Sequence, residues 1–200
     1  MEDVRQMQEK FRLYIISLYK DIPQEVYEGL LSVFCLGVVL FVAFKGIRTG
    51  FRWSSFLLLI EYIFLLFCST VIFRTAGATR RYDFHPFWSY DRPDLLLENI
   101  MNVIVFIPVG MILGSLLRVK GSWTSQATKS MTWLVALLIG CSISITIEAL
   151  QFFFLRGFSE LDDVMHNTIG CILGYLMGFL IVSGFHHITA AVNHLQRASR

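Results

Sequence analysis

The stretch MTWLVALLIGCSISITIEALQFFFL, residues 131–155, decides the class of fold. Its only Asp, Glu, Lys or Arg is Glu148. The apolar core of a bilayer is about 30 Å thick, and a helix that rises about 1.5 Å per residue crosses it in roughly 20 residues. The stretch therefore predicts a transmembrane helix that is long enough to tilt.

The composition of the whole chain agrees with a membrane protein. Of its 200 residues, 55% are apolar or aromatic and only 16% are charged. A soluble fold of this size carries more charge, so a water-soluble enzyme is excluded. The formal net charge of +2 comes without a long basic run, and we therefore expect no nucleic acid partner.

The remaining apolar segments set the number of crossings. Four more are long enough to span a bilayer: residues 26–44, 53–73, 99–117 and 164–185. The sequence thus predicts an all-α, polytopic integral membrane helical bundle with about five transmembrane helices. Its expected parts are an N-terminal amphipathic arm (1–25), the transmembrane bundle (26–185) and a polar C-terminal tail (186–200).

The connecting segments predict an orientation. Residues 45–52, 118–129 and 186–200 contain Lys and Arg but no Asp or Glu. Basic residues close to the ends of spans favour the cytoplasmic side of a membrane. We therefore expect these segments and the C-terminus to be cytoplasmic, and the N-terminal arm to lie outside.

Glu148 is the polar residue that the membrane should tolerate least. Ionisable side chains within spans are rare, and they usually face a partner or water. Gln151 follows at spacing i, i+3, so the carboxylate and the amide share a helix face. The alternative is that Glu148 lies near the outer mouth of its span, where a charge is less costly.

The segment RGFSELDDVMHN, residues 156–167, is the densest polar patch of the chain. A helix that begins within it places Asp163 and Asn167 on one face, while Asp162 complements the positive end of the helix dipole. Two adjacent aspartates also raise the possibility of a metal site or an acid/base pair. Neighbouring helical residues diverge by about 100°, however, and we expect no metal and no cofactor.

Glycines at four-residue spacing predict close helix packing in the third and fifth spans. Small residues let helix backbones approach where no hydrophobic effect drives their association. Such packing would draw Asn102, Glu148 and Asn167 toward a shared interior. The glycines concerned are Gly110, Gly114, Gly170, Gly174 and Gly178.

Three blocks of the sequence resemble the VanZ-like family of bacterial membrane proteins. They are TVIFR (70–74), NVIVFIPVG (102–110) and SITIEALQ (144–151), the last followed by Asp162, Asp163 and Asn167. The resemblance covers residues 53–182. It implies a multi-pass protein of the bacterial cytoplasmic membrane, and a link to the low-level resistance to the glycopeptide teicoplanin that is associated with the family's namesake.

The polar residues in and beside these blocks are the predicted substrate-binding site. They are Arg74, Asn102, Glu148, Gln151, Arg156, Asp162, Asp163 and Asn167. We expect a non-enzymatic envelope protein that binds a lipid-linked or lipophilic ligand, such as a glycopeptide antibiotic of the teicoplanin type, near the outer membrane–water interface. The aromatic loop 74–98 supports this hypothesis, and the expected partners are membrane lipids or lipid-linked envelope intermediates.

Two other functions stay open. The first is an intramembrane enzyme that acts on a lipid headgroup, with Glu148 or Asp163 as the acid/base catalyst and arginines that steady a phosphate. No Ser-His-Asp or Cys-His nucleophile motif supports it. The second is a small transporter, which the lack of internal repeats disfavours.

Overall fold

The computed structural model describes residues 5–6, 8–10, 12–13, 16, 23–43, 48–119 and 126–198. The long helices are α2 (Gln24–Ala43), α3 (Arg48–Phe67), α4 (Leu96–Val119), α5 (Gln126–Phe154) and α6 (Leu161–Ala198). The short elements are the π-helical turn η2 (Cys68–Ile72), the 3-10 turns η3 (Trp88–Asp91) and η4 (Pro93–Leu95), and the strands β1 (Tyr82–Asp83) and β2 (Ser159–Glu160). Most of the predicted arm, residues 1–25, lies outside the described residues.

Among the residues that the structure describes, four helical segments are long and apolar enough to cross a membrane. Their mean hydropathy lies between 1.6 and 2.3. They are Ser55–Ile72, Pro93–Leu117, Thr132–Phe154 and Leu161–Ile181. The prediction of an all-α membrane helical bundle is confirmed. The first expected span, residues 26–44, ends outside the described residues, and α2 is helical over the described part of it.

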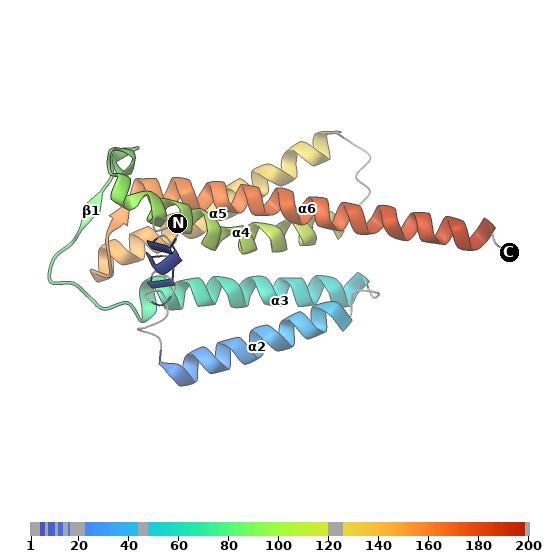
Figure 1. Ribbon diagram of the computed structural model, residues 1–200, viewed down its shortest axis with the longest axis horizontal. Helices are drawn as coiled ribbons and strands as arrows, with labels where there is room; N and C mark the ends of the chain where they lie inside the picture. The colour runs from blue at the N-terminus through green and yellow to red at the C-terminus, as the bar shows by residue number, and fades with distance from the viewer. Residues whose placement is uncertain are drawn as a thin grey trace.

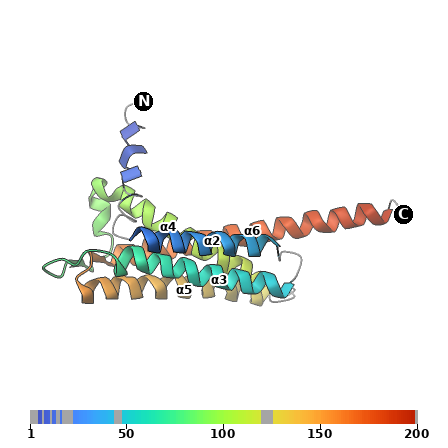
Figure 2. The ribbon, with the colours of Figure 1, turned by 90° about the horizontal axis from the view of Figure 1, so that it is seen from below.

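The helices run side by side along one long axis (Figure 1). Helix α4 packs mainly against α6, α5 packs against α6, and α3 lies between α2 and α4 (Figure 1). In both views, α6 continues past the ends of the other helices toward the C-terminus (Figure 2). Its backbone remains helical through residues 186–198, within the predicted polar tail.

Glycines form the contact between α4 and α6. A Cβ atom added at Gly110 would overlap the carbonyl oxygen of Cys171, and one added at Gly174 would overlap that of Ile107. Added Cβ atoms at Gly114, Gly170 and Gly178 would meet the partner backbone in the same way. The two backbones therefore lie against each other over about three turns, which is the geometry that glycines permit in a membrane.

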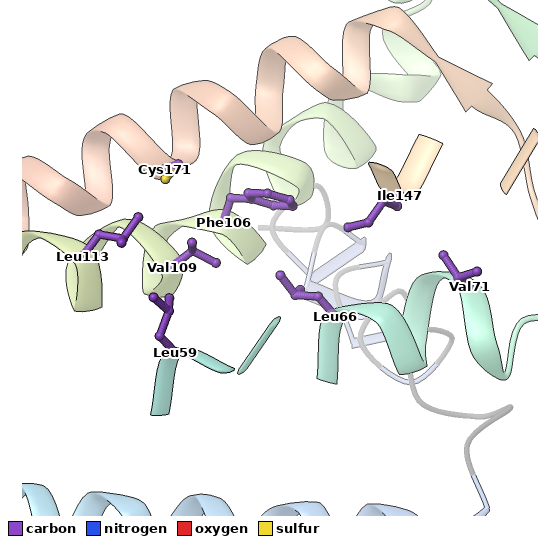
Figure 3. Close-up of a cluster of buried hydrophobic side chains, with 8 residues drawn as sticks. All are labelled: Leu59, Leu66, Val71, Phe106, Val109, Leu113, Ile147 and Cys171. Atoms are coloured by element: carbon purple, nitrogen blue, oxygen red, sulfur yellow. The ribbon is translucent and has the colours of Figure 1, made fainter. Parts of the chain in front are cut away.

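A cluster of buried apolar side chains joins α3, α4, α5 and α6. Phe106 and Val109 of α4 lie between Leu66 of α3 and Cys171 of α6 (Figure 3). The full cluster is Leu59, Leu66, Val71, Phe106, Val109, Leu113, Ile147 and Cys171. The hydroxyl of Tyr62 adds a polar link, since it donates to the carbonyl oxygen of Val105 at 2.8 Å.

The loop between η2 and α4 folds across one end of the bundle. Its strand β1 pairs in parallel with β2, so that Tyr82 lies opposite Ser159. The amide of Gly77 donates to the carbonyl oxygen of Leu155 at 2.7 Å. The loop thereby forms a cap over the ends of α3 and α5 and the beginning of α6 (Figure 1).

Candidate functional site

A cavity of about 420 Å³ lies under the cap, at the end of the bundle. Its inner wall is largely apolar and consists of Tyr62, Leu65, Leu66, Val105, Phe106 and Ile147. A polar layer lies nearer the helix ends and consists of Asn102, Glu148, Gln151, Asp163 and Asn167. The rim carries Arg74, Thr75, Thr79, Arg81 and Glu98. Along α3, α4 and α5, the lining therefore changes from apolar to polar toward the capped end of the bundle.

The structure brings most of the predicted site residues to this cavity. Three helices contribute to the polar layer: Asn102 comes from α4, Glu148 and Gln151 from α5, and Asp163 and Asn167 from α6. Arg74 follows η2 and lies at the rim. Both candidate acid/base residues, Glu148 and Asp163, are thus in one cavity.

A tight turn after α5 holds Glu148 in place. Leu155 and Gly157 adopt positive φ angles of 59° and 107°, and the chain reverses at once into β2. The amide of Glu160 then donates to Glu148 Oε2 at 3.0 Å, and Ser159 Oγ donates to the Glu148 carbonyl oxygen at 3.0 Å. Glu148 is only 6% exposed, so its carboxylate is held by the protein instead of extending into open water.

The amide side chains of the polar layer donate to protein groups. Asn102 Nδ2 donates to Asp163 Oδ1 at 2.6 Å. Gln151 Nε2 donates to the Thr70 carbonyl oxygen at 3.2 Å, which links α5 to η2. The oxygen Oε1 of Gln151 is buried and has no hydrogen-bond partner among the described residues.

The arginines of the rim are positioned by the cap. Arg74 covers Gly157 so closely that an added Cβ there would lie 2.7 Å from the guanidinium carbon. The guanidinium carbon of Arg81 lies 5.3 Å from the centre of the Phe158 ring, a cation–π contact. In the described ranges, neither arginine forms a direct ion pair with the cavity carboxylates. Both guanidinium groups therefore keep hydrogen-bonding capacity for an anion.

The structure places Arg156 outside the cavity lining. Its Nη1 donates to the carbonyl oxygens of Val71 and Arg74, each at 2.9 Å, and also to that of Ile72. A π-helical turn ends with unpaired carbonyls, and a guanidinium close to them satisfies these acceptors. Arg156 therefore holds the end of η2, and through it the backbone of Arg74.

Asp162 is also outside the lining, because it points toward the cap. It is fully buried, and its Oδ1 accepts from the Phe87 amide at 2.6 Å. Its Oδ2 accepts from the amide and the hydroxyl of Ser89, at 3.0 and 2.6 Å. These three bonds fix the left-handed turn at Phe87, whose φ is 66°. Asp162 thus anchors the cap to α6.

Asp162→Asn is expected to loosen the cap. Asparagine has an NH2 group in place of one carboxylate oxygen, and this group cannot accept the hydrogen bonds that the oxygen accepted. The free energy of unfolding should therefore fall by about 3 kcal/mol. Thermal unfolding in detergent, together with limited proteolysis between residues 84 and 95, checks this. Asp94→Asn is the matched control, because Asp94 forms an exposed ion pair with Arg92. An equal effect of both changes would contradict the anchor.

Several acidic or polar residues were not predicted, among them Arg81 of the rim and the following three. Glu98 lies at the cavity rim, Ser144 accepts from Asn167 Nδ2 at 2.8 Å, and Glu160 is buried beside the site. The spacing i, i+4 between Glu98 and Asn102 could have indicated the first of them. The other two depend on the cap and on the crossing of α5 and α6. Within the described ranges, no three His, Cys, Asp or Glu side chains form a metal-binding group.

Glu160 should make the stability of the folded protein depend on pH. Burial, and next the neighbouring Asp163 carboxyl, raise its pKa from 4.5 to about 8. The folded protein then keeps a proton that the unfolded chain releases above pH 4.5. The retained proton stabilises the folded state. This contribution to the free energy of unfolding is fully present below pH 4.5 and is lost as the pH rises to about 8.

Glu160→Gln should flatten this dependence. The fall in melting temperature between pH 5 and pH 8.5 is expected to be smaller in the variant than in the wild type. Asp94→Asn should leave the wild-type slope, since the pKa of Asp94 lies outside this interval. An unchanged slope in Glu160→Gln would show that Glu160 titrates in the normal range of a glutamate.

Comparisons with known proteins identify the family of the chain. No solved structure matches the chain. Protein VanZ of Enterococcus faecium is 34% identical over 77 residues, which are 38% of this chain and 41% of that protein. Residues 55–182 match the VanZ/LLP1 family, and this range contains every residue of the cavity lining. The chain is a multi-pass membrane protein and belongs to the VanZ/LLP1 family.

Proposed function

We propose that the cavity binds the polar head of a lipid-linked or lipophilic envelope ligand at the outer membrane–water interface. The observation that carries this proposal is the layered cavity itself. Its inner wall is apolar, its middle layer is polar, and its rim carries two arginines. A ligand that combines apolar, polar and charged parts matches these three kinds of surface.

The volume limits what can enter. Cavities of roughly 300–1,000 Å³ hold small molecules, and about 420 Å³ suits a headgroup. A whole glycopeptide antibiotic is much larger. For a ligand of the teicoplanin type, the cavity would hold a headgroup-sized part or the lipid beside which the drug lies.

The proposed orientation places the cavity outside the cell and the C-terminus in the cytoplasm of a bacterium. The described parts of the acid-free segments, residues 48–52, 118–119, 126–129 and 186–198, lie at helix ends opposite the cavity. Reporter fusions after residue 198 check this. We expect a fluorescent protein fusion to be active and an alkaline phosphatase fusion to be inactive, and the reverse result would contradict the orientation.

Blocking the cavity tests the function. Thr75 lies at the rim, and Thr75→Trp should fill the entrance. Thr146→Trp is the matched control, because Thr146 is exposed on α5 and is not part of the lining. We expect a susceptible bacterium that produces the wild type or the control to tolerate more teicoplanin than one that produces Thr75→Trp.

The same variants give a direct binding test. Native mass spectrometry of the purified protein with short-chain phospholipids should show one saturable site in the wild type and in Thr146→Trp, and none in Thr75→Trp. Equal teicoplanin sensitivity of all strains, without a saturable lipid site, would contradict the proposed function.

A second candidate function is supported by one observation. Glu148 and Asp163, the two possible acid/base residues, line the same cavity as two arginines. This combination suits cleavage or transfer at a phosphorylated headgroup, where arginines stabilise the charge on phosphate. Lipid analysis of cells that produce the wild type or Asp163→Asn tests it. Identical lipid pools would contradict catalysis and leave the binding function intact.

A further inference from the structure

The polar layer of the cavity offers acceptors that the protein itself does not use. The clearest is Gln151 Oε1, which is buried without a partner among the described residues. Its orientation is determined, because Gln151 Nε2 donates to the Thr70 carbonyl oxygen. A flipped amide would place two oxygens against each other. Gln151 lines the cavity, and its unpaired polar atom is an acceptor and not a donor.

The two carboxylates add further acceptors beside this one. Glu148 Oε2 accepts from a backbone amide, and Asp163 Oδ1 accepts from Asn102. Each carboxylate has a second oxygen, and the described residues donate no hydrogen bond to it. A donor-rich cation fits such a layer, since a buried carboxylate requires a positive partner or hydrogen bonds.

The rim of the cavity offers positively charged hydrogen-bond donors instead of acceptors. Arg74 and Arg81 line it, and in the described part of the chain neither is paired with a cavity carboxylate. Guanidinium groups bind phosphate with two parallel hydrogen bonds. An anion at the rim and a cation in the polar layer would therefore both be satisfied.

Resting on the proposed function, we propose that the ligand of this cavity has a zwitterionic headgroup, with a primary ammonium bound in the polar layer and a phosphate at the arginine rim. A primary ammonium has three N–H donors and no acceptor. A quaternary ammonium has the same charge but no N–H donor, so it would leave Gln151 Oε1 unpaired. Headgroups of the phosphoethanolamine class combine the required groups.

Stepwise N-methylation of one lipid tests the inference. The probes are dioctanoyl phosphatidylethanolamine, its N-methyl and N,N-dimethyl derivatives, phosphatidylcholine and phosphatidylglycerol, titrated into the wild type in detergent. We expect phosphatidylethanolamine to bind at least tenfold more tightly than phosphatidylcholine, with intermediate values between them, because each methyl group removes a donor. Phosphatidylglycerol should also bind at least tenfold more weakly.

The possible results separate this inference from the proposed function. Equal binding of phosphatidylethanolamine and phosphatidylcholine, or tighter binding of phosphatidylglycerol, would overturn the inference and leave headgroup binding intact. Binding of none of these lipids, with no effect of Thr75→Trp on drug tolerance, would overturn both. Free phosphoethanolamine should bind at least tenfold more weakly than the lipid. Equal affinity for the two would leave the proposed headgroup chemistry intact, but it would contradict the proposal that the ligand is a lipid.

One variant tests the contribution of Gln151 Oε1 by itself. Gln151→Met keeps the length of the side chain and removes Oε1. It should weaken phosphatidylethanolamine binding about tenfold and leave phosphatidylcholine binding unchanged, so the preference should shrink about tenfold. An unchanged preference in the folded variant would overturn the role of Gln151. If the variant does not fold, the methylation series on the wild type still decides the inference.

Discussion

Replacing Gly174 with alanine is expected to destabilise the protein by about 3 kcal/mol, or to prevent its folding, because the new Cβ has no room. That atom would overlap the carbonyl oxygen of Ile107. The obstacle is backbone and not the flexible end of a side chain, so α4 and α6 must separate to admit it. Unfolding in detergent, followed by circular dichroism, measures the loss.

The same separation should impair the cavity, since Asn102 of α4 donates to Asp163 of α6. Gly29→Ala is the matched control. Nothing lies within 4 Å of a Cβ added at Gly29, and alanine favours a helix over glycine by about 1 kcal/mol. The control should be as stable as the wild type or more so. Equal stability of both variants would contradict the close contact of α4 and α6.

Arg74→Gln is expected to weaken the binding of dioctanoyl phosphatidylethanolamine by about 30-fold or more. The loss of one hydrogen-bonded contact between a guanidinium and a phosphate costs about 2 kcal/mol. Arg74 has a fixed position over Gly157, and in the described structure no ion pair with a cavity carboxylate competes for it. Titration by native mass spectrometry measures the change.

Arg80→Gln is the control for the charge itself. Arg80 is exposed, lies 5.5 Å from the centre of the Phe152 ring and is not part of the cavity lining. Both variants lose one positive charge from the cap. Similar losses of affinity in the two variants would indicate long-range attraction of the lipid instead of a contact at the rim.

The sequence allows the bundle to be predicted, because crossing a bilayer requires long apolar helices. The stretch around Glu148 and the glycines of α4 and α6 therefore indicate both the spans and their packing. The cap is different. Strands β1 and β2 have two residues each, and their pairing joins Tyr82 to Ser159 across the length of α4 and α5. Such short strands have no periodicity that a sequence could show.

The site residues also divide into those that the sequence indicates and those that depend on the tertiary fold. Polar side chains inside apolar spans are conspicuous, so Asn102, Glu148 and Gln151 could be predicted as site residues from the sequence alone. Helix periodicity separates Asp163, which shares a face with Asn167, from Asp162, yet both were predicted to bind the substrate. They are neighbours on a helix, so their side chains point about 100° apart, one toward the cap and the other toward the cavity. Which of them faces the cavity depends on the rotation of α6 that its glycines impose.

The central claim is that the cavity holds a selected headgroup. The most direct measurement is photocrosslinking with a diazirine analogue of leucine at Leu65, on the inner wall, and at Leu138, which is 55% exposed on α5. After irradiation in native membranes, mass spectrometry identifies the attached lipid. We predict one lipid class, bearing a primary amine, at Leu65 and the bulk lipid mixture at Leu138. The same mixture at both positions, or no lipid at Leu65, would contradict the claim.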